Sequence, residues 1–325
     1  DLIKQYGADG IRTGMLFSSP AGNDLLFDEK LCEQGRNFSN KIWNVFRLIK
    51  GWEVVEIEQP KEAAIATDWF ENQFNLVLKE ILENYNKFRI SDALLATYKL
   101  IWDDFASWYL EIIKPAYGSP IDSKTYHSTI QFLENSLKLL HPVMPFITEE
   151  IWQNITPRTK ENALIISEFP KEKGFSLDSL EKFKETQELI SAIRNVRNKE
   201  NISLKENLKL LIATKNSELQ TSIIAKLANI SISFENEIPK NTITIRVNNS
   251  EYALLLNEVK NSEEDKQKLL DELNYLEGFL KSVQNKLKNE KFVNNAPQNV
   301  LLNERKKEAD ASTNINLIKE RLSSF

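Results

Sequence analysis

A cluster of basic and amide side chains has the residue types and spacing to bind nucleic acid. Two arginines, one lysine and three asparagines fall within a stretch that holds no acidic residue: Arg36, Asn37, Asn40, Lys41, Asn44 and Arg47. Amide groups hydrogen-bond the edges of unpaired bases, while arginine and lysine bind phosphates or stack on base faces. The same composition also fits an ordinary solvated helix face.

Apolar residues in the same stretch predict the helix that positions this cluster. Phe38, Ile42, Val45, Phe46 and Ile49 recur at steps of three and four residues, so they form one buried stripe. The polar cluster must occupy the remaining helix surface. Some of its members are expected to face a ligand and others a neighbouring helix, and the sequence does not distinguish between them.

No group of residues in the chain predicts catalysis. There is no Gly-rich phosphate loop and no nucleophile beside a base, and His127 and His141 lack the spacing of metal ligands. We interpret His141, which follows Leu140 at a helix end, as a structural residue. Cys32 is interpreted as a helix-face residue rather than a nucleophile. We therefore expect no catalytic residue and no metal site in this chain.

The composition sets broad limits on the class of protein. A length of 325 residues favours about two domains, and a hydrophobic content of 41% fills ordinary cores. No apolar run approaches the ~20 residues that span a bilayer. Cys32 is the single cysteine, which excludes an internal disulfide and suits a reducing, cytoplasmic compartment. Because the net charge is −5, any nucleic-acid contact must come from local basic patches.

Helices dominate the first half of the chain. The apolar spacing predicts a helix over 69–85 with its N-cap at Thr67 or Asp68, a second from Ser91 to Pro115, and a third over 122–140. Two prolines interrupt the chain in 141–152 before a short helix capped near Thr148. Residues 163–170 read as a strand leaving this helical bundle.

A small α+β module is predicted over 176–256. A helix over 180–200 is followed by strands at 208–214 and 230–234, with a short helix over 217–227 between them. Residues 242–248 alternate at period two, and 252–256 are expected to add an edge strand. The first helix carries three basic residues, Arg194, Arg197 and Lys199, which also suit an ordinary charged helix face.

The last part of the chain predicts an antiparallel coiled-coil hairpin. Its first helix has a heptad seam with alternating steps of four and three, formed by Leu269, Leu273, Leu276, Leu280, Val283 and Leu287. Pro297 suits the first turn of a returning helix, whose seam includes the polar residues Glu304 and Glu308. A helix over 262–289 would be about 40 Å long. Basic residues gather near the tip: Lys281, Lys286, Lys288, Lys291, Arg305, Lys306 and Lys307.

Four motifs resemble class I aminoacyl-tRNA synthetases, and in particular the bacterial valyl-tRNA synthetase family. They are Gly7-Ala-Asp-Gly-Ile-Arg12, Gly35-Arg-Asn-Phe-Ser-Asn-Lys-Ile-Trp-Asn44, His141-Pro-Val-Met-Pro-Phe-Ile-Thr-Glu-Glu-Ile-Trp152 and Phe292-Val-Asn-Asn-Ala-Pro297. The third motif is shared with the enzymes that charge branched aliphatic amino acids. The isoleucyl enzyme commonly ends in a cysteine-rich zinc module, which has no counterpart here.

The resemblance implies a mainly α fold in four parts. These are a junction that follows the catalytic domain (1–34), a helical-bundle anticodon-binding domain (35–175), the small α+β module (176–256) and a coiled-coil tRNA-binding arm (257–325). It implies that the cluster at 36–47 binds the anticodon loop, and that Arg194, Arg197 and Lys199 contact the tRNA backbone. The basic residues of the arm would contact the tRNA elbow.

The resemblance further implies a monomeric, cytoplasmic enzyme that attaches valine to tRNA(Val) with ATP and Mg²⁺. The catalytic and editing sites would lie before Asp1, so we expect the chain alone to bind tRNA without aminoacylating it. Two alternatives stay open at this point. One is the corresponding part of an isoleucyl or leucyl enzyme, and the other is a non-catalytic scaffold whose coiled coil binds protein.

Overall fold

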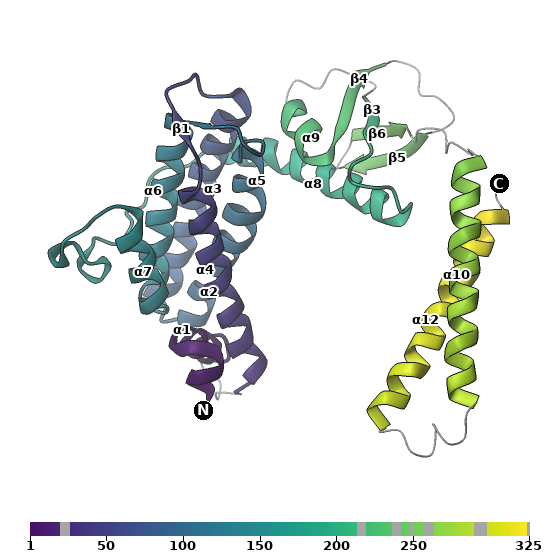
Figure 1. The fold of residues 1–325 in the computed structure, drawn as a ribbon. Coiled ribbons are helices and arrows are strands. Elements are labelled where there is room, and N and C mark those ends of the chain that lie inside the picture. The colour runs from purple at the N-terminus through teal and green to yellow at the C-terminus, as the bar shows by residue number, and fades with distance from the viewer. Residues whose placement is uncertain are drawn as a thin grey trace. The chain divides into compact units, whose positions relative to one another are not determined.

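A computed structural model describes residues 1–19, 27–212, 219–235, 242–247, 250–255, 263–288 and 298–323 (Figure 1). The chain divides into two compact units. One comprises Asp1–Ile238 with Thr244–Leu254, and the other comprises Pro239–Ile243 with Leu255–Phe325. The first unit thus holds both the helical bundle and the small α+β module, and the second holds a pair of long helices.

Eight helical segments and a two-residue strand pair build the bundle. In order they are α1 (Leu2–Phe17), α2 (Glu29–Lys50), α3 (Lys61–Asn86), α4 (Ile90–Lys99), the π-helix η1 (Leu100–Tyr109), α5 (Leu110–Ile113), α6 (Ser123–Leu140) and α7 (Pro145–Ile155). The strands β1 (Val54–Val55) and β2 (Ile121–Asp122) pair in parallel. Asp28 and Asp122 cap α2 and α6, each accepting a hydrogen bond from a backbone N–H of the first turn.

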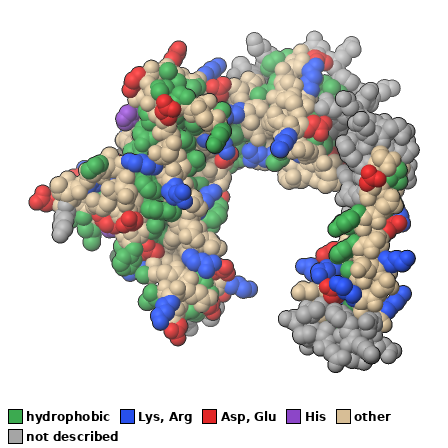
Figure 2. Space-filling model, viewed as in Figure 1, with side chains coloured by type: hydrophobic (Ala, Val, Ile, Leu, Met, Phe, Trp, Pro, Cys, Tyr) green, Lys and Arg blue, Asp and Glu red, His purple; other side chains and the backbone are tan. Residues whose placement is uncertain are grey.

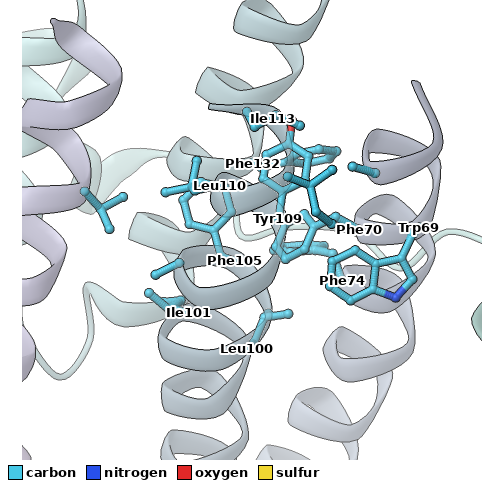
Figure 3. Close-up of a cluster of buried hydrophobic side chains, with 14 of the residues drawn as sticks. Trp69, Phe70, Phe74, Leu100, Ile101, Phe105, Tyr109, Leu110, Ile113 and Phe132 are labelled. Atoms are coloured by element: carbon cyan, nitrogen blue, oxygen red, sulfur yellow. The ribbon is translucent and has the colours of Figure 1, made fainter. Parts of the chain in front are cut away.

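Aromatic side chains from α3, η1 and α6 form the centre of the bundle (Figure 3). Phe70 of α3 is fully buried, and its ring lies 5.1 Å from Tyr109 and 4.9 Å from Phe132, measured between centroids. Edge-to-face and offset aromatic pairs contribute roughly 0.5–1.5 kcal/mol each beyond the burial of their area. The hydroxyl of Tyr109 is satisfied by Thr129, 2.8 Å away, so this core carries a buried polar group without leaving it unpaired.

Two sequence motifs more than 130 residues apart meet in the bundle. Asp9 of α1 accepts hydrogen bonds from the backbone N–H groups of Phe146 and Ile147, at 3.3 and 2.7 Å, and so caps α7. Arg12 donates to the carbonyl oxygens of Pro142 and Val143 at 2.9 and 2.8 Å. These two charged residues of the first motif therefore hold the proline-containing corner between α6 and α7.

Three local predictions for the bundle are wrong. Helix α3 begins at Lys61, because the small buried residues Ala63 and Ala66 extend its apolar stripe before the expected cap. Residues 163–170 form no strand. They contain a short 3₁₀ helix (Leu164–Ile166) in which only Leu164 is buried. The segment predicted as one helix from Ser91 to Pro115 contains the π-helix, whose wider turns a period of 3.6 does not detect.

The α+β module consists of a four-stranded sheet and two helices. One helix precedes the first strand, and the other forms the crossover between the first two strands. Helix α8 (Leu177–Lys199) precedes β3 (Leu208–Ile212), α9 (Thr221–Ala228), β4 (Ile230–Phe234), β5 (Thr242–Val247) and β6 (Ser250–Leu255). The strand order is β4-β3-β6-β5, with β3 and β4 parallel. The prediction that the last strand lies at an edge is wrong, because β6 is central and buries Tyr252, Ala253 and Leu254 in succession.

The second unit contains α10 (Glu263–Lys288) and α12 (Gln298–Ser323) packed side by side (Figure 1). Lys319 pairs with Glu277 at 2.7 Å and Lys286 with Glu304 at 3.9 Å, so the helices run antiparallel. The described buried residues between them include Val283, Ala311, Ile315 and Ile318. Pro297 and Lys291 lie outside the described residues, as does the side chain of Leu269.

Candidate nucleic-acid interface

A close helix crossing fixes α2 in the bundle. A Cβ atom at Gly35 would lie 2.4 Å from the carbonyl oxygen of Gly10, and one at Gly14 would lie 2.8 Å from the Sγ atom of Cys32. Only glycine permits α1 and α2 to approach this closely. Cys32 is fully buried in this crossing, as its predicted helix-face role requires. The buried face of α2 is thus held against α1.

The opposite face of α2 carries the predicted cluster. At 100° per residue, all six members fall within an arc of about 140°, and the buried stripe from Phe38 to Ile49 lies across the helix from them. Asn37, Asn40, Asn44 and Arg47 are exposed, while Arg36 and Lys41 are partly buried. The structure therefore brings the six residues together on a single surface.

Two basic residues at the margins of this surface are held by neighbours. Arg36 forms a salt bridge to Glu33 at 3.1 Å and lies 5.6 Å from the centre of the Tyr6 ring. The Nζ atom of Lys41 lies 5.3 Å from the centre of the Trp102 ring, a cation–π distance. These contacts hold the side chains of Arg36 and Lys41 at the two edges of the surface formed by the six residues.

The middle of the surface is available for hydrogen bonding. Among the residues that the structure describes, the side chains of Asn40, Asn44 and Arg47 have no hydrogen-bond partner. Leu48, which is 43% exposed, lies beside them on the same face. Two free amides, a guanidinium and an apolar side chain on a rigid helix can hydrogen-bond and pack against unpaired bases.

The prediction for Arg197 is wrong. This residue has no exposed surface, and its guanidinium donates hydrogen bonds to the carbonyl oxygens of Ser203, Glu206 and Asn229 at 2.8–2.9 Å. Burial lowers the pKa of the guanidinium. Because a phosphate cannot reach it, Arg197 serves the fold by joining the end of α8 to the start of β4.

The two other basic residues of α8 differ from each other. Arg194 is partly buried, donates to the carbonyl oxygen of Leu227 at 3.2 Å and lies 5.7 Å from the centre of the Trp108 ring. Lys199, at the last position of α8, is exposed. Of the three predicted backbone contacts, only Lys199 presents a free charge to solvent.

Basic residues gather on one end of the helix pair in the second unit. Figure 2 shows blue side chains gathered on one part of this helix pair. The described members of this group are all exposed: Lys281, Lys286, Lys288, Arg305, Lys306 and Lys307. Glu304 is buried among them and accepts from Lys307 at 2.7 Å, and this hydrogen bond lowers the pKa of its carboxyl group.

Comparisons with known proteins find two matching families and several relatives. Residues 67–212 match the family described as the anticodon-binding domain of tRNA ligase, and residues 261–325 match the valyl tRNA synthetase tRNA binding arm. The valine–tRNA ligase of Christiangramia forsetii is 50% identical over 328 residues, and that of Phocaeicola vulgatus is 48% identical; both alignments cover the whole of this chain. Along its whole length, the chain is therefore similar to valine–tRNA ligases.

The chain spans 37% of the length of these two relatives. A solved leucyl-tRNA synthetase complex from Agrobacterium radiobacter is also similar to this chain. The alignment covers 53% of this chain and 20% of the synthetase chain, at 17% identity. The TM-score of this alignment is 0.38. The anticodon-domain match runs into β3, beyond the predicted boundary at 175, and begins after α2. The polar face of α2 therefore lies outside both family matches, although the relatives align across it.

Sequence reasoning missed one polar stripe on α6. Ser128, Gln131, Asn135 and Lys138 follow each other at steps of three and four residues and line one cavity. The same spacing within the predicted helix over 122–140 marks this polar stripe in the sequence. Among the described residues, no helix is long and apolar enough to cross a membrane, and no three acidic, histidine or cysteine side chains group as metal ligands.

Proposed function

We propose that the chain is the tRNA-recognition part of a valine–tRNA ligase. The observation that carries the proposal is the pairing, in one chain, of an anticodon-binding match and a valyl-type tRNA-arm match. Identity of 50% along the whole chain supports the same conclusion. The valyl-type arm match favours this function over an isoleucyl or leucyl counterpart and over a protein-binding scaffold.

In this proposal, the polar face of α2 contacts the anticodon loop. Its asparagines hydrogen-bond base edges, because an amide supplies both a donor and an acceptor. Arg47 and the two marginal cations, Arg36 and Lys41, bind phosphates or stack on bases. The exposed positions of Asn40, Asn44 and Arg47 and their free hydrogen-bonding groups support these roles.

The helix pair α10–α12 acts as an antiparallel coiled-coil arm that contacts the tRNA elbow. Its buried apolar residues supply the seam, and its exposed lysines and arginine supply the charge. A duplex and its loops are bound there by shape and backbone rather than by base sequence. Lys199 of α8 adds a further backbone contact.

The complete enzyme would attach valine to tRNA(Val) in the cytoplasm as a monomer, using ATP with Mg²⁺. This chain supplies binding and orientation of the tRNA, and its described residues contain no group that we assign to the chemical step. We expect purified chain to show no valine-dependent ATP–pyrophosphate exchange. Exchange that survives repeated purification would contradict this assignment.

Competition gel shifts test the proposal. Unlabelled tRNA(Val) should displace labelled tRNA(Val) at lower concentration than tRNA(Ile) does. Asn40→Ala or Asn44→Ala should weaken tRNA(Val) binding by ~1–3 kcal/mol, with a smaller effect on a transcript whose anticodon has been changed. Asn86→Ala, which removes an exposed amide at the end of α3, is the matched control. Equal weakening for every tRNA would assign the α2 amides to backbone contact or folding.

A further inference from the structure

A cavity of about 280 Å³ lies between α3, α6 and the segment that precedes α8. It belongs to the first unit and takes no part in the surface on α2. Phe74, Phe132 and Phe169 line it; Phe74 and Phe132 are nearly buried, and Phe169 is partly exposed. The volume lies just below the usual range of small-ligand pockets, ~300–1,000 Å³, so the cavity suits one small group.

A buried amide holds the outer wall of this cavity in place. Asn75 of α3 is 4% exposed, donates to the carbonyl oxygen of Glu71 at 2.8 Å and accepts from the backbone N–H of Lys173 at 3.2 Å. The neighbouring Asn72 accepts from the N–H of Ser176 at 2.6 Å. The segment is therefore tied to α3 at two points, which gives the cavity a defined wall.

Helix α6 presents a polar stripe to the cavity. Ser128, Gln131 and Asn135 line it, and Lys138 continues the stripe one turn further. Among the described residues, the side-chain amides of Gln131 and Asn135 have no hydrogen-bond partner. Each amide offers a donor and an acceptor, the pair of groups that the edge of a nucleobase requires.

The charge of the lining is weakly positive. Three lysines and two glutamates line the cavity, which gives a net charge of +1. Lys171 is paired with Glu168 at 2.8 Å and Lys173 with Glu71 at 3.6 Å. Lys138 forms no salt bridge among the described residues, and its Nζ atom lies 5.7 Å from the centre of the Trp152 ring. One cation is therefore available at the end of the stripe.

These features select a class of ligand. Gln131 is exposed and Asn135 is partly exposed, so a purely apolar ligand that covered these amides would remove their water at a cost of about 1–3 kcal/mol for each amide that it buried. A small inorganic anion would meet one available cation and would leave the aromatic surface unused. A planar base with an attached phosphate matches the aromatic lining, the amides and Lys138 together.

We propose that this cavity binds one unstacked base of the tRNA, with Gln131 and Asn135 hydrogen-bonding its edge and Lys138 contacting its phosphate. This second contact site rests on the proposed tRNA-binding function. A free mononucleotide offers the same chemistry, so the experiment must separate a base within the tRNA from a free nucleotide.

The test uses the full 325-residue chain with a tRNA(Val) transcript. Gel shifts compare the wild-type chain with Gln131→Ala/Asn135→Ala and with Lys138→Met. The matched control is Lys124→Met, which removes an exposed lysine of the same helix that does not line the cavity. Acylation of tRNA 2′-hydroxyl groups, with and without protein, locates any nucleotide whose mobility changes on binding. Melting temperatures verify that each variant is folded.

The double amide variant is expected to bind tRNA(Val) roughly tenfold or more weakly and to lose the acylation change at one unpaired nucleotide. Lys138→Met should weaken binding more than Lys124→Met does. Wild-type affinity and an unchanged acylation pattern in the folded double variant would overturn the inference while leaving the proposed function intact. If the wild-type chain bound no tRNA, the proposed function itself would fail.

Titration with AMP, CMP, GMP and UMP separates the two sources of the base. Weak binding of the mononucleotides, displaced by tRNA(Val), is expected if the cavity takes a base of the tRNA. A mononucleotide that binds the wild-type chain tightly, is lost in the double variant and is not displaced by tRNA(Val) would contradict the assignment to tRNA.

Discussion

Replacement of Arg197 by methionine should destabilise the α+β module. Methionine keeps much of the side-chain volume but removes three charge-assisted hydrogen bonds to the carbonyl oxygens of Ser203, Glu206 and Asn229. Hydrogen bonds to charged groups contribute about 1.5–3 kcal/mol each, and the loss is offset by removing the cost of burying a guanidinium. We expect a net decrease of ~3–5 kcal/mol in the free energy of unfolding.

This loss is a large share of the stability of a typical domain, ~5–15 kcal/mol. Urea unfolding followed by circular dichroism measures the decrease, and hydrogen exchange locates it. Exchange should accelerate first at β3 and β4, because the arginine joins the loop before β3 to the residue before β4. Arg197→Lys retains a charge without the planar fork, so it should destabilise the protein less than Arg197→Met.

Lys199→Met is the matched control for Arg197→Met. Lys199 is exposed two residues further along α8, and we expect its replacement to change the free energy of unfolding by no more than about 0.5 kcal/mol. A loss below ~1 kcal/mol for Arg197→Met would refute the structural role.

Three further perturbations follow from the structure. Burial raises the pKa of Asp104 to about 6, so the folded state holds a proton that the unfolded state has lost, and the free energy of unfolding should fall as pH rises from about 4 to 6. Asp104→Asn should remove this slope and add on the order of 1–3 kcal/mol at pH 7, measured by urea unfolding across that range. Gly35→Ala should lower the melting temperature, because its Cβ atom would lie 2.4 Å from the carbonyl oxygen of Gly10. Changing Arg305, Lys306 and Lys307 together to glutamine should reduce the magnitude of the log–log salt slope of tRNA binding by about 1–2. The change is smaller than three phosphate contacts would give, because consecutive residues of a helix point in different directions and cannot all contact one tRNA backbone.

Each of these expectations has a distinct contrary outcome. An unchanged pH slope in Asp104→Asn would mean that another group titrates there. Asp103→Asn should keep the slope but reduce it, because the charge of Asp103 helps to raise the pKa of Asp104. A melting temperature of Gly35→Ala equal to that of the wild type would show that α1 and α2 can separate without cost. Loss of anticodon discrimination in the triple arm variant would contradict the assignment of those cations to phosphate contact.

The parts that sequence predicted well depend on local periodicity. The bounds of α6 and α10 and both faces of α2 follow from the period of one helix, because side chains three and four residues apart share a face. The six-residue cluster could therefore be grouped without knowing its neighbours. The contacts of Arg36 and Lys41 could not be predicted in this way, because their partners Tyr6 and Trp102 come from other helices.

The parts that sequence missed depend on partners far along the chain. Arg197 and Lys199 are both basic residues near the end of α8, yet one is buried by carbonyl groups up to 32 residues away. Helical spacing places Arg197 on the buried stripe of α8 with Ile190 and Ile193, and Lys199 off it, but the carbonyl groups that Arg197 binds lie outside the helix. The central position of β6 depends on pairing with strands on both sides, and the wall of the cavity depends on Asn75, which bonds a residue 98 positions later.

The proposed function separates specificity from electrostatic attraction. The free asparagines lie on a helix whose opposite face is held by a glycine crossing, so they can read bases with little loss of conformational freedom. A group of exposed cations lies on α10 and α12, where phosphate contacts would increase affinity for any tRNA. Mutations on α2 should therefore change which tRNA is bound, whereas mutations on the arm should change how strongly all tRNAs are bound and how steeply binding depends on salt.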